Sequence, residues 1–418
     1  MATSTRFEVV VRSSLNNNNK GEVHMQRTRL IKSLAIIAAA GLAFAACGDD
    51  AKDSSTTDGA TSPTLCDASK GPAEKTKVKL QLQWFTQAQF AGYYAAVDQG
   101  CYAEAGLDVE ILQLPAVEIS PIDVLASGGA DFALSWVPKA LASREAGANV
   151  VDIAQVFQRS GTLQVSFKAA NITSAADFSG KKIGSWGFGN EFEIFAALGK
   201  AGLDPASDVE IVGQNFDMSG LLQGDIDAAE AMTYNEYAQV LEAKNADTGE
   251  LYTADDLNVV SYETEGVGML QDAIWADGDR LANDPAYKAT AIAFVKASLK
   301  GWAFCRGNTT TCRDIVVANG PTLGSGHQLW QMNEINALIW PSADGVGHID
   351  QAAWDRTVGI ASNTPNLDGA TVLSQPVSAD AFTNEIVDAA LAELKAEGVD
   401  VVGNSWTRID VTLTEGGV

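Results

Sequence analysis

The sequence predicts an α/β protein built from two lobes. Three observations lead to this prediction: strand patterns alternate with helical patterns, the alternation forms two successive blocks, and two long extended segments lie beside these blocks. The extended segments are residues 152–168 and 258–270. Two blocks joined by two extended segments indicate two lobes with a two-stranded hinge. We expect lobe 1 to comprise residues 76–161 plus 266–418, and lobe 2 to comprise residues 162–265.

The first block begins with a strand at residues 78–84. Val78, Leu80 and Leu82 alternate there with polar residues, and this period of two buries one face of a strand. Pro138 suits the first turn of a helix, where its missing N–H is not needed. The remaining elements predicted for this block are a helix at about 88–100, a strand at 107–112, a helix around 119–127 and a strand at 130–136.

The second block repeats the alternation. Asn190 with Glu193, and Thr233 with Glu236, have the spacing of a capping box, which marks the start of a helix. The predicted strands are 181–186, 209–213 and 225–232. Three helices follow the second extended segment, in DPAYKATAIAFVKASLKGWAFC, HQLWQMNEINALIW and DAFTNEIVDAALAELKAEG.

The composition is that of a globular protein with a strongly acidic balance. The chain has 418 residues, of which 46% are hydrophobic and 19% are charged, and its formal net charge is −25. This length allows two or more domains. The negative charge opposes binding to nucleic acid, so we expect no nucleic-acid partner.

An export signal is predicted near the beginning of the chain. Met25 opens MQRTRLIKSLAIIAAAGLAFAAC, in which basic residues precede the apolar run 34–46. This run is shorter than the roughly 20 residues that span a bilayer. Small residues precede Cys47, as in a bacterial lipoprotein signal peptide, and an ordinary cleaved signal peptide is the alternative. We expect residues 1–46 to be removed, with Met25 as the true initiator.

The mature protein would then be anchored to a membrane. Lipidated Cys47 would hold it on the extracytoplasmic face of the cell membrane, and residues 47–75, which begin with a small polar stretch, would form a flexible tether. An even number of further cysteines in this compartment suggests disulfides. The short loop between Cys305 and Cys312 favours that pair, and Cys66 with Cys101 would tie the tether to the first helix.

A metal site is the weaker interpretation of these cysteines. The mature chain contains only His327 and His348, and no CxxC motif occurs. We therefore expect no metal and no cofactor, and we expect neither histidine to be a ligand.

Four predicted strand ends carry residues that packing alone does not require. In an open α/β sheet, ligands bind beyond the carboxyl ends of the strands. Two of the four ends belong to each lobe, so all four would line one cleft if the lobes face each other. The candidate ligand-binding residues are Gln83, Trp84 and Phe90, then Ser135 and Trp136, then Trp186, Gly187, Gly189, Asn190 and Glu191, and finally Glu230 and Tyr234.

These residue types suit a flat heteroaromatic ligand. Aromatic side chains stack on such a ring, and each contact adds roughly 0.5–1.5 kcal/mol beyond burial. Amides and a carboxylate satisfy ring nitrogens and amino groups that are costly to bury without partners. Each residue also has a packing interpretation, and only their convergence on strand ends favours binding. The predicted stacking walls are Trp84, Phe90, Trp136, Trp186 and Tyr234, and the predicted hydrogen-bonding partners are Gln83, Asn190 and Glu230.

Several stretches resemble one known family. They are LQLQWFTQAQFAGYYAAVDQGCYAEAGLDVEI, LASGGADFAL, GKKIGSWGFGNEFE and GDIDAAEAMTYNE. They are similar to the ABC-transporter solute-binding lipoproteins related to thiamine pyrimidine synthase, an SsuA-like group with formylaminopyrimidine-binding and riboflavin-binding members. The resemblance implies a periplasmic-binding-protein fold that is type II-like, with two hinge crossings. It also implies a monomer that delivers its ligand to the permease and ATPase subunits of an ABC importer.

The same family contains an enzyme, the fungal pyrimidine synthase. That enzyme consumes its own histidine and pyridoxal phosphate, and the resemblance places its lysine and histidine at Ser135 and Lys139 of this chain. Its cysteine-rich run would fall near Glu265–Gln271, which reads EGVGMLQ. Without the amine and the histidine this chemistry has no reagents, so we expect no enzymatic activity.

The sequence therefore predicts an extracytoplasmic solute-binding lipoprotein that captures a small aromatic heterocycle, above all a thiamine pyrimidine precursor. Three further possibilities stay open: a riboflavin-binding protein, a protein that binds an alkyl sulfonate or nitrate, and a synthase in thiamine biosynthesis. An anion site would show arginine or lysine at the strand ends, and only Lys139 lies near one. This favours a neutral or aminated ring over an anion.

Overall fold

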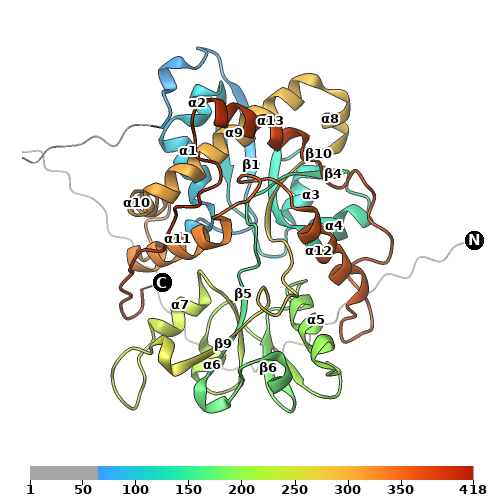
Figure 1. Cartoon of the computed structure of the whole chain (residues 1–418), viewed down its shortest axis with the longest axis vertical. Coiled ribbons are helices and arrows are strands. Elements are labelled where there is room, and N and C mark those ends of the chain that lie inside the picture. The colour runs from blue at the N-terminus through green and yellow to red at the C-terminus, as the bar shows by residue number, and fades with distance from the viewer. Residues whose placement is uncertain (1–64, 418) are drawn as a thin grey trace, which may run out of the picture. The chain divides into compact units, whose positions relative to one another are not determined.

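A computed structural model describes residues 65–417. The predicted signal peptide, its initiator Met25, the lipidation site Cys47 and most of the predicted tether lie outside the described residues. The described chain is organised around two groups of β-strands, one above the other in Figure 1. We call the part built on the five-stranded sheet lobe 1, and the part built on the three-stranded and two-stranded sheets lobe 2.

The sheet of lobe 1 has the order β2-β1-β3-β10-β4. Strand β1 pairs in parallel with β2 and β3, whereas β10 is antiparallel to both β3 and β4. The alternation of apolar residues found around Val78 buries Val78 and Leu80 in β1. The strands are β1 (Thr76–Gln81), β2 (Leu107–Leu112), β3 (Phe132–Trp136), β4 (Val150–Gln155) and β10 (Asp272–Asp277).

Lobe 2 has a three-stranded sheet of order β8-β5-β9 and a two-stranded sheet, β6-β7. An isolated parallel bridge between Ile183 and Ala228 connects the two sheets, so β6 lies beside the start of β8. The strands are β5 (Thr162–Phe167), β6 (Lys182–Ser185), β7 (Glu210–Gly213), β8 (Ala229–Met232) and β9 (Leu257–Ser261).

The chain crosses between the lobes twice, from β4 to β5 and from β9 to β10. The strand that follows each crossing, β5 or β10, is the antiparallel strand of its sheet. The crossings are bonded to each other, because Gln271 accepts a hydrogen bond from Gly161 N (2.9 Å) and donates one to Thr162 Oγ1 (2.7 Å). The predicted two-lobed α/β fold with two crossings is confirmed, while the residue boundaries given for the lobes stay a prediction.

Helices cover the sheet of lobe 1 (Figure 1). Helix α9 packs along α1, and no Cβ fits at their contact, because one built at Gly301 would lie 2.0 Å from Gly92 O. The helices of lobe 1 are α1 (Ala91–Asp98), α2 (Cys101–Glu104), α3 (Pro121–Ala126), α4 (Val137–Glu145), α8 (Gly278–Asn283), α9 (Pro285–Gly307), α10 (Thr309–Asn319), α11 (Ser325–Ile339), α12 (Gln351–Asn363) and α13 (Glu385–Ala396). Those of lobe 2 are α5 (Phe192–Ala201), α6 (Ser219–Leu222) and α7 (Glu236–Leu241).

Both predicted capping boxes are wrong. Helix α5 has Glu191 at its N-cap, and Glu193 instead accepts a hydrogen bond from Met269 N (2.6 Å), in the second crossing. Helix α7 has Asn235 at its N-cap, and Glu236 accepts from Met232 N (2.9 Å). In both cases the acid satisfies a backbone N–H outside the box. The sequence spacing of a capping box does not show that another backbone N–H will take the acid as its acceptor.

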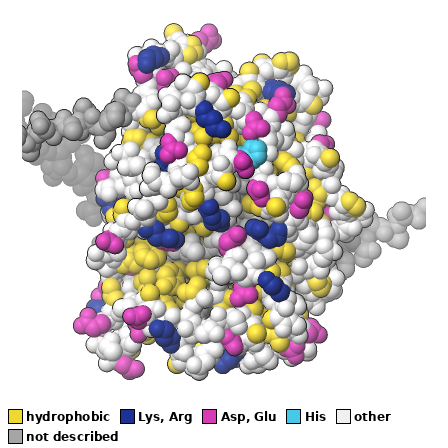
Figure 2. Space-filling view, viewed as in Figure 1, with side chains coloured by type: hydrophobic (Ala, Val, Ile, Leu, Met, Phe, Trp, Pro, Cys, Tyr) yellow, Lys and Arg dark blue, Asp and Glu magenta, His cyan; other side chains and the backbone are white. Residues whose placement is uncertain are grey.

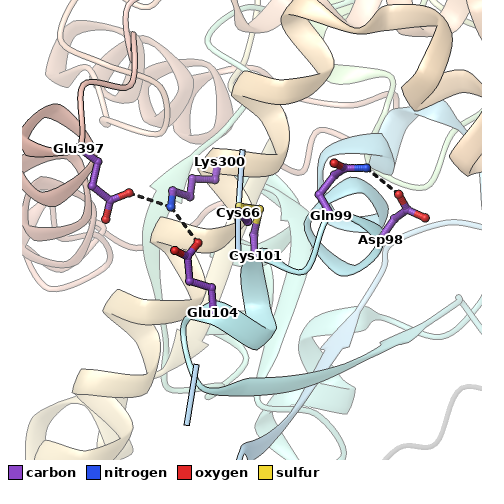
Figure 3. The surroundings of a disulfide bond; sticks show 7 residues. All are labelled: Cys66, Asp98, Gln99, Cys101, Glu104, Lys300 and Glu397. Atoms are coloured by element: carbon purple, nitrogen blue, oxygen red, sulfur yellow. Dashed lines mark hydrogen bonds and ion pairs between the residues drawn. A yellow bond between two sulfur atoms is a disulfide. The ribbon is translucent and has the colours of Figure 1, made fainter. Parts of the chain in front are cut away.

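Both predicted cysteine pairs are disulfide-bonded. Cys66–Cys101 fixes the start of the described chain to α2, and Cys305–Cys312 joins α9 to α10. Figure 3 shows Lys300 beside the first disulfide, between two carboxylates. Lys300 Nζ lies 3.2 Å from Glu104 Oε2 and 2.7 Å from Glu397 Oε2. Cys66 is thus buried and attached to lobe 1 within the range predicted for the tether, whose end at residue 75 stays a prediction.

The surface carries interspersed charges of both signs. In the view of Figure 2, acidic and basic side chains are scattered over the face, and hydrophobic side chains gather in its lower left part. In residues 65–417, no helix is both long enough and apolar enough to cross a membrane.

Candidate functional site

A cleft of about 590 Å³ lies between the two lobes. It is lined by the segments that follow β1, β2 and β3 in lobe 1 and by those that follow β6, β7 and β8 in lobe 2. This arrangement follows from the topology, because parallel strands direct their carboxyl ends to the same edge of a sheet. The two edges face each other across the cleft.

The wall formed by lobe 1 presents two indoles. Trp84 follows β1 and Trp136 ends β3, and both side chains are half-buried. Trp136 Nε1 donates a hydrogen bond to Asp272 Oδ1 (3.0 Å), which fixes the plane of the ring. Lys139, in the first turn of α4, places its Nζ 4.9 Å from the centroid of the Trp136 ring.

The wall formed by lobe 2 presents Trp186, Phe216 and Tyr234. The Trp186 and Phe216 rings are stacked with centroids 6.0 Å apart and an angle of 25° between their planes. Phe216 also reaches the other lobe, with its centroid 5.1 Å from that of Trp84. The buried Trp186 Nε1 donor has no hydrogen-bond partner in the described part of the chain.

The loop between β6 and α5 forms part of the cleft rim. Gly187, Phe188 and Gly189 have φ angles of 67°, 54° and 86°, a left-handed conformation that glycine adopts easily and phenylalanine rarely does. The loop is closed by Asn190, whose Nδ2 donates to Gly187 O (2.8 Å). Phe188 is 85% exposed and extends the aromatic surface of the rim.

Buried acids lie beneath this aromatic surface. Burial raises the pKa of Asp272 to about 7, although hydrogen bonds from Gln89 and Trp136 act in the opposite direction. Burial also raises the pKa of Glu230 to about 8, against the hydrogen bonds from Trp186 N (2.7 Å) and Ser185 Oγ (3.0 Å).

Lys139 is the cationic side chain of the cleft lining. Desolvation lowers the pKa of its ammonium group to about 8, and the nearby carboxyls Glu230, Glu191 and Asp272 oppose this shift. A cation whose pKa is lowered thus lines the cleft, and the buried acids behind the lining keep their protons readily near neutral pH. Such a site is suited to hydrogen bonding more than to charge pairing.

Most of the predicted site residues do line the cleft. They are Gln83, Trp84, Ser135, Trp136, Trp186, Gly189, Asn190 and Tyr234. Their contact with a ligand stays a prediction. The cleft-lining segments come from two lobes and from strand ends far apart in the sequence, as the strand-end argument expected.

Four predicted residues do not line the cleft. Phe90 is fully buried in the core of lobe 1, because the turn η2 (Ala88–Phe90) directs it inward, so the prediction that it stacks on a ligand is wrong. Glu230 is fully buried within β8, and its carboxylate supports the backbone of Trp186 instead of facing the cleft. Gly187 shapes the rim loop, and Glu191 accepts a hydrogen bond from Gly189 N (2.9 Å).

Several lining residues were missed by the sequence prediction. Phe216 follows the carboxyl end of β7, and Leu114, Val117 and Ile119 follow β2, so the strand-end rule would have found them had it been applied to these strands. No strand-end signal marks Asp272, which is buried behind the lining residues and accepts a hydrogen bond from Trp136 Nε1. It begins β10, whose antiparallel direction brings its amino end to the cleft edge.

Comparison with known proteins gives the family. The family model described as NMT1/THI5 like matches residues 87–310. The chain belongs to this family. It is 27% identical over 318 residues to the formylaminopyrimidine-binding protein of Halalkalibacterium halodurans, covering 74% of this chain and 90% of that protein. It is 26% identical over 352 residues to the riboflavin-binding protein RibY of Chloroflexus aurantiacus, covering 78% of this chain and 91% of that protein.

The NMT1/THI5-like chain also has structural neighbours. A putative periplasmic sulfonate-binding protein of an ABC transporter from Methylobacillus flagellatus matches with a TM-score of 0.53 and 20% identity, covering 81% of this chain and 99% of that structure. At this identity the likeness concerns the fold alone. It supports the periplasmic-binding-protein fold that the two lobes and two crossings describe.

Proposed function

We propose that this protein is the extracytoplasmic solute-binding component of an ABC importer and captures a small aromatic heterocycle, first of all a thiamine pyrimidine precursor. In this proposal the protein is a monomer, is anchored to the membrane through a lipid on Cys47, and delivers its ligand to a permease driven by an ATPase. Two curated relatives of similar length are named as binding proteins for formylaminopyrimidine and riboflavin.

The observation that carries the proposal is the convergence of aromatic side chains from both lobes on one cleft. Trp84 and Trp136 come from lobe 1, and Trp186 and Tyr234 come from lobe 2. A flat ring held between such walls gains contacts with both lobes at once. Because a ligand shifts an equilibrium by its differential affinity, this ligand would favour the closed arrangement over an open one.

The charges of the cleft favour a neutral or aminated ring over a sulfonate or nitrate. Anion sites are built from guanidinium or ammonium groups that are free to pair. Lys139 is the lining cation, and Glu118 and Glu236 also line the cleft. The described lining therefore holds one cation beside two acidic side chains, and it does not present the cluster of cations that anion sites use.

A non-enzymatic role is part of the proposal. Ser135, at the position that matches the cofactor lysine of the fungal pyrimidine synthase, offers a hydroxyl that cannot form a Schiff base. Lys139 stands where that enzyme supplies a histidine, so the histidine that would be consumed is missing at this position. In this proposal the chain binds a pyrimidine, and Ser135 and Lys139 do not provide the groups that would make one by that route.

A second candidate ligand is a flavin. The volume of about 590 Å³ lies within the range of roughly 300–1,000 Å³ in which pockets enclose drug-sized ligands. A single pyrimidine ring would leave much of this space to water. A tricyclic ring with a polar tail would occupy more of it, and this observation favours riboflavin over a small alkyl sulfonate or nitrate.

Identification of a co-purified ligand tests the proposal. The protein would be purified from its own cells, denatured, and its small-molecule fraction analysed by absorbance and mass spectrometry. We expect a heteroaromatic compound in stoichiometric amount, with the flavin absorbance band deciding between riboflavin and a pyrimidine. Recovery of an alkanesulfonate or another non-aromatic anion would overturn the proposal.

A further inference from the structure

Helix α11 of lobe 1 contacts lobe 2 at a place separate from the two crossings. Trp330 Nε1 donates to Thr233 O (3.0 Å), and Gln331 Nε2 donates to Asn235 Oδ1 (2.8 Å). His327, which is fully buried, lies one turn earlier on the same helix. Its Nδ1 is 2.9 Å from Glu242 Oε2 and its Nε2 is 2.8 Å from Asn235 Oδ1.

The orientation of the Asn235 amide decides what His327 can do. Asn235 Nδ2 lies 2.6 Å from Glu236 Oε1, so this atom is the NH₂ group and donates to the carboxyl. The oxygen Oδ1 therefore faces His327 and Gln331. Since an amide oxygen only accepts hydrogen bonds, His327 Nε2 must carry a proton.

A chain of amides fixes the same orientation from the other end. Gln89 Nε2 donates to both oxygens of Asp272 (3.1 and 3.0 Å), and Gln89 Oε1 accepts from Gln87 Nε2 (2.6 Å). Gln87 Oε1 accepts from Gln331 Nε2 (3.2 Å). With Asp272 as the acceptor, each amide takes the orientation that makes Gln331 Nε2 the donor to Asn235 Oδ1.

Both ring nitrogens of His327 consequently face acceptors, an amide oxygen and a carboxylate oxygen. A neutral imidazole carries one N–H and cannot donate on both sides. We propose that His327 is a protonated clip, an imidazolium that joins the two lobes and positions Asn235, and through Gln331 also Gln87, at the edge of the cleft.

The charges around His327 support an imidazolium. Glu242 pairs with it directly, with Oε2 2.9 Å from Nδ1. The more distant charges are already paired. Lys244 pairs with Glu415, whose neighbour Gly416 donates its N–H to Glu242 O. Glu334 of α11 pairs with Arg408. No cation of the described chain pairs with either oxygen of Glu242 in competition with His327.

His348 provides a matched control in the same molecule. Its Nδ1 lies 2.9 Å from Asp388 Oδ1, but its Nε2 lies 3.3 Å from Asn384 Nδ2. Asn384 Oδ1 accepts from Ile349 N (2.9 Å), so Nδ2 is an NH₂ donor that needs an acceptor. A neutral ring with its proton on Nδ1 satisfies both neighbours of His348. The two histidines should therefore differ in protonation.

Nitrogen NMR of the whole protein without ligand tests the protonation directly. The sequence has three histidines, so the imidazole signals of ¹⁵N-labelled protein are few, and His348→Gln and His327→Gln identify them. At neutral pH we expect two similar ¹⁵N shifts for His327, as in an imidazolium, and two well-separated shifts for His348. Separated shifts for His327 would overturn the proposal. Because no ligand is present, this outcome is independent of the proposed function.

Small-angle scattering of the ligand-free protein tests whether His327 joins the two lobes. This test does not depend on the proposed function. At neutral pH we expect His327→Gln to have a larger radius of gyration than the wild type, because the variant loses the contact between His327 and Glu242 that joins the lobes. His348→Gln should behave as the wild type. Equal radii for His327→Gln and the wild type would contradict the proposal.

Discussion

The rings of Trp84 and Phe216 lie 5.1 Å apart, centroid to centroid, and belong to different lobes. Trp84 follows β1 of lobe 1, and Phe216 follows β7 of lobe 2 and stacks on Trp186. The aromatic residues proposed to hold the ligand therefore also contact each other across the cleft. A ligand ring would exchange these contacts for its own, so ligand binding and the arrangement of the lobes are expected to be coupled.

Replacement of Trp186 by alanine should weaken ligand binding at least about tenfold. A stacked aromatic contact is worth roughly 0.5–1.5 kcal/mol beyond the apolar area it buries, and about 1.4 kcal/mol corresponds to a factor of ten. Calorimetric titration with the co-purified ligand measures the change, and Trp84→Ala should act in the same direction. The matched control is Phe167→Ala, since Phe167 is half-buried against Tyr252 at the other end of β5. Unchanged affinity in both tryptophan variants would exclude stacking.

Replacement of Glu230 by glutamine should change how stability depends on pH. Burial raises the pKa of Glu230 from 4.5 to about 8, so the folded protein holds a proton that the unfolded chain releases. The stability that Glu230 contributes is thus complete at acidic pH and is lost as pH rises towards 8. Glu230→Gln resembles the protonated acid and should reduce this loss.

Urea unfolding at acidic and alkaline pH measures the effect. We expect nearly equal stability of wild type and Glu230→Gln in acid and a more stable variant in alkali. Exposed Glu210→Gln is the control and should follow the wild type. A variant that loses stability at every pH would show that the Glu230 carboxylate is required in its charged form.

Replacement of Gly301 by alanine should destabilise lobe 1 by about 1–3 kcal/mol or more, which is the usual cost of overpacking. The new Cβ would lie 2.0 Å from Gly92 O, and backbone cannot move aside as a side chain can. Gly307→Ala, on the same helix α9, is the control, because nothing lies within 4 Å of the added atom. Equal unfolding free energies for the two variants would contradict the close contact of α1 and α9.

Removal of the Cys66–Cys101 disulfide should cost more stability than removal of Cys305–Cys312. The two bonds close loops with sequence separations of 35 and 7 residues. By chain entropy alone these loops correspond to about 4 and about 2.5 kcal/mol. Double alanine variants compared by chemical unfolding test the order. A reversed order would mean that contacts around Lys300 compensate for the loss of the first bond.

Much of the fold and part of the cleft lining could be predicted from the sequence because parallel strands impose a simple rule. Trp84 and Trp136 were found because the carboxyl ends of β1 and β3 meet at one edge. The rule does not apply to Asp272, whose strand runs in the opposite direction. It also says nothing about side-chain direction, and for this reason Phe90 was assigned to the cleft although η2 turns it into the core.

Contacts between distant helices were beyond the sequence prediction. The pattern of the segment containing His327 indicated a packed helix, and α11 is one. Nothing in that pattern indicated that His327 would meet Glu242 and Asn235, which belong to the other lobe. Such pairings depend on how the lobes are brought together, and local periodicity carries no information about it.

Parallel calorimetric titrations of the wild-type protein test the central claim most directly. The titrants would be hydroxymethylpyrimidine, formylaminopyrimidine, thiamine, riboflavin and an alkanesulfonate. The account predicts tight binding of one heteroaromatic compound and no heat from the alkanesulfonate. Binding of the alkanesulfonate, with silence from all four heterocycles, would contradict the claim that the aromatic cleft holds a flat ring.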